Sequence, residues 1–80
     1  MKADVKKLGA LISTNICVLC ATHGKTMKDV ARIAGIKSPN TLNSRRDKPG
    51  NWTLGQLVHI AAYFNRSVEW LLADHSKEGT

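Results

Sequence analysis

The chain has 80 residues, which is room for one small domain and leaves no space for a large catalytic cleft. Its hydrophobic fraction of 42% is typical of a folded domain, and its net charge of +6 is unevenly spread. Residues 1–48 hold ten of the twelve Lys and Arg beside three Asp and carry +7, whereas residues 49–80 carry −1. A basic half on a folded domain indicates a polyanionic partner, usually nucleic acid, or else only a solubilising surface.

No apolar run approaches the ~20 residues that are needed to span a membrane. The N-terminus lacks the apolar core and cleavage site of a signal peptide. We therefore expect a cytosolic protein whose two cysteines, Cys17 and Cys20, are reduced thiols.

Apolar residues recur at steps of three and four along most of the chain, which predicts an all-α fold. The expected helices span residues 4–22, 27–34, 39–47, 54–64 and 68–74. The β-branched residues between Ile12 and Leu19 leave a strand as the main local alternative. We prefer a helix there because the apolar stripe extends over four turns.

Cap chemistry supports these boundaries. Thr26 with Asp29 and Thr53 with Gln56 have the form of capping boxes, in which each side chain bonds the other residue's backbone amide. Two more serines precede expected helices, Ser38 directly before Pro39 and Ser67 before the last helix. Gly24, Gly35 and the turn-forming stretch 47–51 fall where helices should end, and the tail 75–80 is expected to fray.

Residues 26–46 have the pattern of a helix-turn-helix. Ala31 is small where the two helices must cross closely, and Gly35 can adopt the backbone conformation of the turn. Ile36 provides an apolar residue just after the turn, and Leu42 can pack the second helix inward. This segment is therefore the leading candidate for a functional site.

The chain resembles the Cro/repressor-type (XRE-like) helix-turn-helix family of phages and bacteria over roughly residues 8–73. The resemblance is carried by Asp29-Val-Ala-Arg-Ile-Ala-Gly-Ile, by Thr53-Leu-x-x-Leu57-x-x-Ile-Ala61 and by Ser67-Val-Glu-Trp-Leu-Leu72. It implies a five-helix lambda-repressor-like DNA-binding domain over residues 1–80, with the helix-turn-helix at helices 2 and 3. The implied partner is double-stranded DNA, and the implied location is the cytoplasm of a bacterial host, on the nucleoid when DNA is bound.

The chain departs from the family pattern in three places. The stretch from Gly35 to Leu42 is one residue longer than usual, which Ser38-Pro39 can absorb. Arg45 falls where the family has an apolar residue, so either its stem lies across the edge of the core or the helix is rotated. Met27 replaces a glutamine that contacts phosphate in the family, a role that Lys28 can take.

The second helix of the motif should enter the major groove, where each base pair presents a distinct pattern of donors and acceptors. Short polar residues and a proline on its outer side are the expected base readers, namely Pro39, Asn40, Thr41, Asn43 and Ser44. Cations and helix-terminal amides around it are the expected phosphate contacts, namely Lys28, Lys37, Ser38, Arg45, Arg46, Lys48 and Thr53. Each of these side chains can also be ordinary solvated surface.

The sequence indicates a transcription regulator that binds a palindromic operator as a homodimer. Leu11 and Val18 on the first helix, and Trp70 on the last, are each expected either to form the dimer interface or to extend the core. A protein-binding module such as an antitoxin is the alternative. A zinc or redox protein built on Cys17, Cys20 and His23 is a third reading, but a structural zinc site needs four ligands. We expect no enzyme activity, cofactor, metal, membrane or small-molecule substrate.

Overall fold

The computed structural model describes residues 5–46 and 48–75, which contain five α-helices, one 3-10 turn and no strand. The elements are α1 (Val5–His23), α2 (Met27–Ala34), α3 (Pro39–Ser44), η1 (Pro49–Asn51), α4 (Leu54–Tyr63) and α5 (Val68–Leu72). The predicted all-α class and its five helices are confirmed, and the strand considered between Ile12 and Leu19 is wrong because these residues lie within α1. None of the described helices is both long and apolar enough to cross a membrane.

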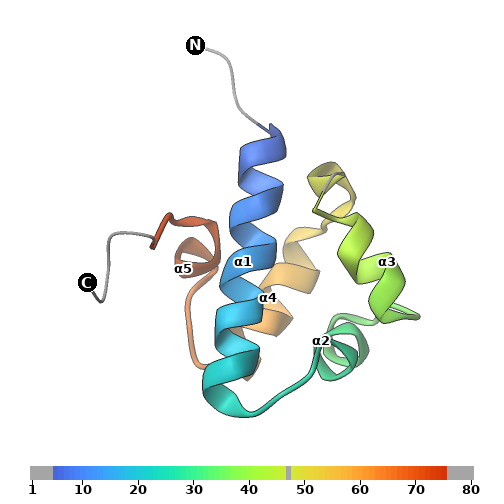
Figure 1. Cartoon of the computed structure of the whole chain (residues 1–80), viewed down its shortest axis with the longest axis vertical. Helices are drawn as coiled ribbons and strands as arrows, with labels where there is room; N and C mark the ends of the chain where they lie inside the picture. The colour runs from blue at the N-terminus through green and yellow to red at the C-terminus, as the bar shows by residue number, and fades with distance from the viewer. Residues whose placement is uncertain (1–4, 47, 76–80) are drawn as a thin grey trace.

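The helices pack around one apolar core. In Figure 1, α1 crosses the front of α4, with α5 on one side and α2 and α3 on the other. Although α1 and α5 are far apart in the sequence, they lie side by side. The largest fully buried side chains come from α1 to α5 alike, namely Ile16, Leu19, Val30, Leu42, Ile60 and Leu71.

The predicted caps begin their helices as expected. At α2, the Thr26 hydroxyl accepts from the Asp29 amide at 3.2 Å while the Asp29 carboxylate accepts from the Thr26 amide at 3.0 Å. The same reciprocal pair joins Thr53 and Gln56 at α4, with distances of 3.0 and 3.1 Å. Local cap chemistry therefore determines where the helices of this fold begin.

Two helices, α3 and α5, end two or three residues earlier than predicted, while the other predicted ends are met within one residue. α3 ends at Ser44 rather than at residue 47, and α5 ends at Leu72 rather than at residue 74. The amide of Arg45 donates to the Leu42 carbonyl at 3.1 Å, which tightens the last turn of α3, and Lys48 has left the helical conformation before Pro49, with φ −127° and ψ 64°.

Asn15 is the buried polar residue of the described core, with 3% of its surface exposed. Its Nδ2 atom donates to the carbonyls of Leu71 at 2.7 Å, Ala73 at 2.8 Å and Trp70 at 3.3 Å. These carbonyls lie in the last turn of α5 and just after it, where a helix runs out of its own amide donors, so Asn15 caps α5 from the middle of α1.

The chain continues past α5 in contact with the fold. The His75 ring stacks on Trp70 with 4.1 Å between the ring centroids. The expected frayed tail therefore begins no earlier than residue 76, and residues 76–80 lie outside the described part of the chain.

Candidate nucleic-acid interface

The turn between α2 and α3 has the geometry that its sequence predicts. Gly35 has a φ of 74°, in the left-handed region that favours glycine. The Ile36 amide closes the turn on the Ala31 carbonyl at 2.8 Å. Ala31 is 2% exposed where α2 packs into the core, and Ile36 is 8% exposed just after the turn. α2, the turn and α3 thus form the predicted helix-turn-helix.

α3 has one buried side and one solvent-facing side. Leu42 is 2% exposed and fixes the inner side, while Asn40, Thr41 and Ser44 are exposed on the outer side. Ser38 caps the helix, since its hydroxyl accepts from the Thr41 amide at 3.3 Å. The side chains of Pro39 and Asn43, two expected base readers, lie outside what the structure describes.

The two exposed hydroxyls are held by their own helix. The Ser44 hydroxyl donates to the Thr41 carbonyl at 2.7 Å, which leaves its oxygen lone pairs as acceptors. The Thr41 hydroxyl lies 3.2 Å from the Ser38 hydroxyl and shares a hydrogen bond with it. α3 therefore presents pre-oriented polar atoms on its outer side, and Asn40 adds an exposed amide that can both donate and accept.

Exposed cations occur within the motif and directly after it. Lys28, Lys37, Arg46 and Lys48 are all exposed. In the part of the chain that the structure describes, which excludes Asp47, the one ion pair joins Arg32 to Asp29 at 2.8 Å. No described carboxylate therefore neutralises these four cations, which leaves their charge available to a polyanion.

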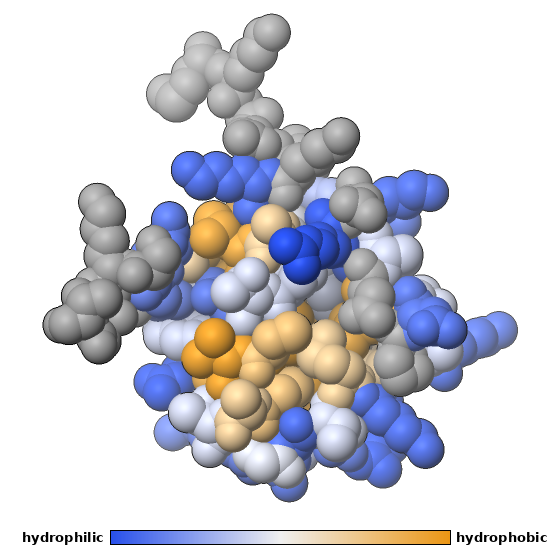
Figure 2. Space-filling model, viewed as in Figure 1, coloured by the Kyte–Doolittle hydropathy of each residue, from blue (hydrophilic) through white to orange (hydrophobic). Residues whose placement is uncertain are grey.

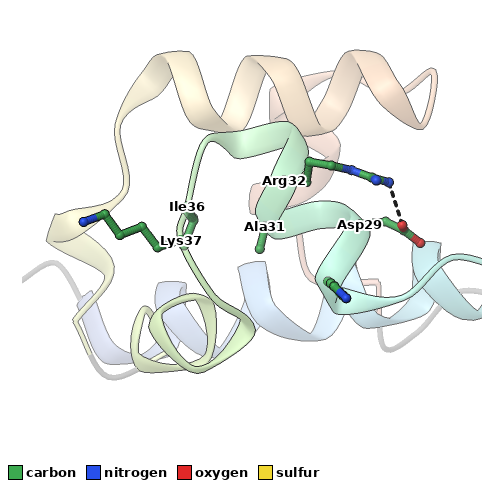
Figure 3. A pocket seen from close by; sticks show the side chains of 6 residues that line it. Asp29, Ala31, Arg32, Ile36 and Lys37 are labelled. Atoms are coloured by element: carbon green, nitrogen blue, oxygen red, sulfur yellow. Dashed lines mark hydrogen bonds and ion pairs between the residues drawn. The ribbon is translucent and has the colours of Figure 1, made fainter.

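Two of these cations border the same hollow. It lies between α2 and the turn, and it is lined by Lys28, Lys37, Ala31, Ile36 and the Asp29–Arg32 pair. Figure 3 shows Lys37 extending away from the ion pair, with Ala31 and Ile36 between them. Short apolar side chains thus separate the paired arginine from the unpaired lysine.

Asp29 keeps its charge near these lysines. The hydrogen bond from the Thr26 amide lowers the pKa of the Asp29 carboxyl, and the Thr26 hydroxyl and the charge of Arg32 lower it further. Asp29 is therefore ionised at neutral pH. Its negative charge stabilises the N-terminus of α2 and pairs with Arg32.

Arg45 lies in the turn that follows α3, half buried at the edge of the core. Its Nη1 atom donates to Gln56 Oε1 at 3.0 Å, and its guanidinium carbon lies 5.2 Å from the centroid of the Trp52 ring. The expectation that its stem crosses the core edge fits this placement, and Leu42 faces inward as the unrotated register requires. Gln56 was not expected as the partner, because the sequence does not show that the α4 cap lies beside this turn.

Two expected phosphate contacts are thus already engaged within the protein. Arg45 is bonded to Gln56, and the Thr53 amide donates to the same Gln56 oxygen at 3.1 Å. Either group must give up this bond to contact phosphate directly.

Gly9 supports the site from α1, a role that the sequence did not suggest. A methyl group on Gly9 would collide with the Arg46 carbonyl and lie 3.1 Å from Pro49 Cγ. The chain after α3 therefore packs directly on the α1 backbone. A glycine inside an otherwise good helix is the one signal in the sequence for this close approach.

The cysteines and His23 do not gather into a metal site. Cys20 is buried with its sulfur 3.8 Å from that of Met27, and burial raises the pKa of its thiol, while Cys17 is exposed. The His23 ring packs on Phe64, with 5.3 Å between centroids. Within the described residues, no three His, Cys, Asp or Glu side chains lie close enough to share a metal ion.

Comparison with known proteins bears on the whole motif. Searches of curated proteins and of solved structures each found no match to this chain. A protein-family model described as a Cro/C1-type HTH DNA-binding domain matches residues 15–74, which include all of α2 to α5. Its range contains the helix-turn-helix, the polar side of α3 and the unpaired cations. The chain therefore belongs to the Cro/C1-type helix-turn-helix family of DNA-binding domains.

Proposed function

We propose that this DNA-binding domain is a sequence-specific transcription regulator of the phage or prophage Cro/repressor kind, acting on a palindromic operator as a homodimer. The proposal treats residues 1–80 as one domain and places it in the bacterial cytoplasm, on the nucleoid when bound. The observation that carries it is the solvent-facing polar side of α3, between exposed cations that no described carboxylate neutralises.

The outer side of α3 supports base reading in the major groove. Asn40 can bond adenine through two atoms, since its amide offers a donor and an acceptor together. Ser44 offers an acceptor because its proton is held by the Thr41 carbonyl, which favours a base with an exposed amino group, cytosine or adenine. Thr41, Asn43 and Pro39 complete the proposed base-reading set.

The cations support phosphate binding. Lys28, Lys37, Arg46 and Lys48 are the proposed direct contacts, because they are exposed and unpaired by described carboxylates. The proposed set also includes the backbone amide of Ser38, which directly precedes α3, together with Arg45 and Thr53. The last two are the weaker contacts because each must first release Gln56.

Dimerisation would give the specificity that one short helix lacks. A single α3 reads only a few base pairs, whereas a two-fold dimer reads two half-sites about 34 Å apart. The symmetry of the dimer then requires a palindromic operator.

The test is to select bound duplexes from a random pool and to titrate salt against the selected sequence. If the dimer contacts about eight phosphates, four through each copy, affinity should fall about 10⁴-fold between about 50 and 200 mM salt. The selected sites should contain two related half-sites. A flat salt dependence, or no binding to any duplex, would contradict the proposal and favour the protein-binding alternative, such as an antitoxin.

A further inference from the structure

α1 carries no Asp, Glu, Lys or Arg between Leu8 and Gly24, although the whole chain has a net charge of +6. A surface helix usually carries charged or polar residues on the side opposite the core. Here only one side of α1 packs into the core, through Ile12, Ile16 and Leu19. The opposite side is uncharged and faces solvent.

This opposite side has the spacing of a helix-packing surface. Its residues are exposed or half-buried and recur at steps of three and four; we call Ala10, Leu11, Thr14, Cys17, Val18 and Ala21 the outer face of α1. Such spacing forms a stripe along a helix, here about 17 Å long. Figure 2 shows hydrophobic residues gathered over α1 on the face toward the viewer, with hydrophilic residues around them.

The outer face is shaped as a ridge between two grooves. Val18, which is 49% exposed, and Thr14 line both grooves. One groove runs toward Met27 and Arg46, and the other runs toward Lys7 and toward Asp74 and His75, which follow α5. Helices pack by placing the ridge of one into the groove of another, so this surface can receive a second helix of similar shape.

We propose that the outer face of α1 is the surface through which two copies of this chain associate, with the α1 helices packed against each other. The inference rests on the proposed homodimer and names its interface. Two copies with a net charge of +6 repel each other, so they can pack closely only where the surface has no charge. The stripe itself offers an acidic partner no cation, because the nearest ones, Lys7 and Arg46, line the grooves beside it.

A two-fold axis near the middle of the stripe places Thr14 close to its own copy and lets each Val18 enter a groove of the other. Arg46 lies at the rim of one groove, where its charge stays in water. Asn40, Thr41 and Ser44 are not part of the face, so the association leaves the outer side of α3 exposed.

The experiment compares Val18→Glu with Val58→Glu by sedimentation over a range of protein concentrations. Val58 is a matched control because it lies on α4 and is 47% exposed, close to the 49% of Val18. A carboxylate forced into an apolar interface loses its hydration, so Val18→Glu should weaken dimerisation at least about 100-fold. Val58→Glu should dimerise as the wild type does, and circular dichroism should show both variants folded.

Cys17 gives an independent measurement on unmodified protein. It lies in the outer face and is exposed, while Cys20 is buried. The rate of thiol labelling should fall as the wild type dimerises at higher concentration, and should not depend on concentration in Val18→Glu. Labelling of Cys17→Ser measures how much Cys20 contributes to the observed rate.

A dimeric Val18→Glu protein, or dissociation by Val58→Glu alone, would overturn the proposal. So would a wild type that stays monomeric both free and on operator DNA. These results can be told apart from a failure of the proposed function, because DNA binding is measured on a single half-site, which one copy of the chain can bind. A monomeric Val18→Glu that still binds a half-site supports both, whereas loss of all DNA binding by a dimeric wild type would contradict the function alone.

Discussion

Arg45 and Arg46 are neighbours in the chain, yet they have different surroundings. Arg45 turns toward Trp52 and Gln56, while Arg46 is exposed and its carbonyl packs against Gly9. The fold places Trp52 and the cap of α4 beside Arg45, whereas the side chain of Arg46 faces solvent. Their contributions to DNA binding should therefore differ.

At the residue scale we predict that Arg46→Ala weakens binding to selected and random duplexes by the same factor. In a homodimer the substitution removes two phosphate contacts, one in each copy, so the slope of log affinity against log salt should become less steep by about 1.8. Fluorescence anisotropy at several salt concentrations measures both quantities. Arg32→Ala is the control, and it should change the slope less because Asp29 already pairs with Arg32. Loss confined to the selected sequence would mean that Arg46 reads a base instead.

At the scale of elements, the start of α2 depends on an ionised capping residue. Because hydrogen bonds from Thr26 hold the pKa of Asp29 below its ordinary value, Asp29 stabilises the fold fully above its unfolded-state pKa of about 4. This contribution is lost as the pH falls through the lower pKa of the folded state.

We therefore predict that the free energy of unfolding at pH 7 is larger for the wild type than for Asp29→Asn, and that this difference vanishes in strong acid. Urea unfolding at a series of pH values from 2 to 7 measures this. A difference of the same size at both ends of the series would show that charge on Asp29 plays no part in the cap.

Two helical glycines should respond to alanine with opposite signs. At Gly9 the new methyl group meets the Arg46 carbonyl, and overpacking of this kind costs about 1–3 kcal/mol. At Gly55 the nearest atom is 3.9 Å away, so Gly55→Ala should stabilise the fold by about 0.4–1 kcal/mol through the unfolded state. Thermal unfolding of the two variants checks the signs. Stabilisation by Gly9→Ala would contradict the close packing of α1 on the chain after α3.

At the scale of the whole molecule, the sequence predicts what local chemistry controls. The five helices, the caps at Thr26 and Thr53, and the turn at Gly35 follow from neighbours within four residues. Three contacts could not be predicted, because each joins segments that only tertiary packing brings together. They are the bond from Arg45 to Gln56, the close approach of the Arg46 carbonyl to Gly9, and the hydrogen bonds that Asn15 donates to the carbonyls at the end of α5. For the site, the sequence predicts that the polar residues of α3 face outward, but it does not predict that α3 ends at Ser44.

The hydrogen bonds from Asn15 to the end of α5 join residues 56 and 58 positions apart, and they should determine which part of the fold opens first. A five-residue helix does not persist alone, so α5 depends on its docking against α1. We predict that the α5 amides of the wild type exchange with solvent only on global unfolding, and that in Asn15→Leu they exchange by local opening. Native-state hydrogen exchange measures this directly. Protection of α5 equal in both proteins would show that apolar packing alone holds it.

The bonds from Asn15 to α5 also determine how the domain would carry a mechanical load. Tension applied at the two chain ends would pass from the first turns of α1 across Asn15 to the end of α5, and would bypass residues 24–67 between them. α3 would lie in a slack part of the chain, so a pull on the termini would peel off α5 before it disturbed the proposed base-reading segment.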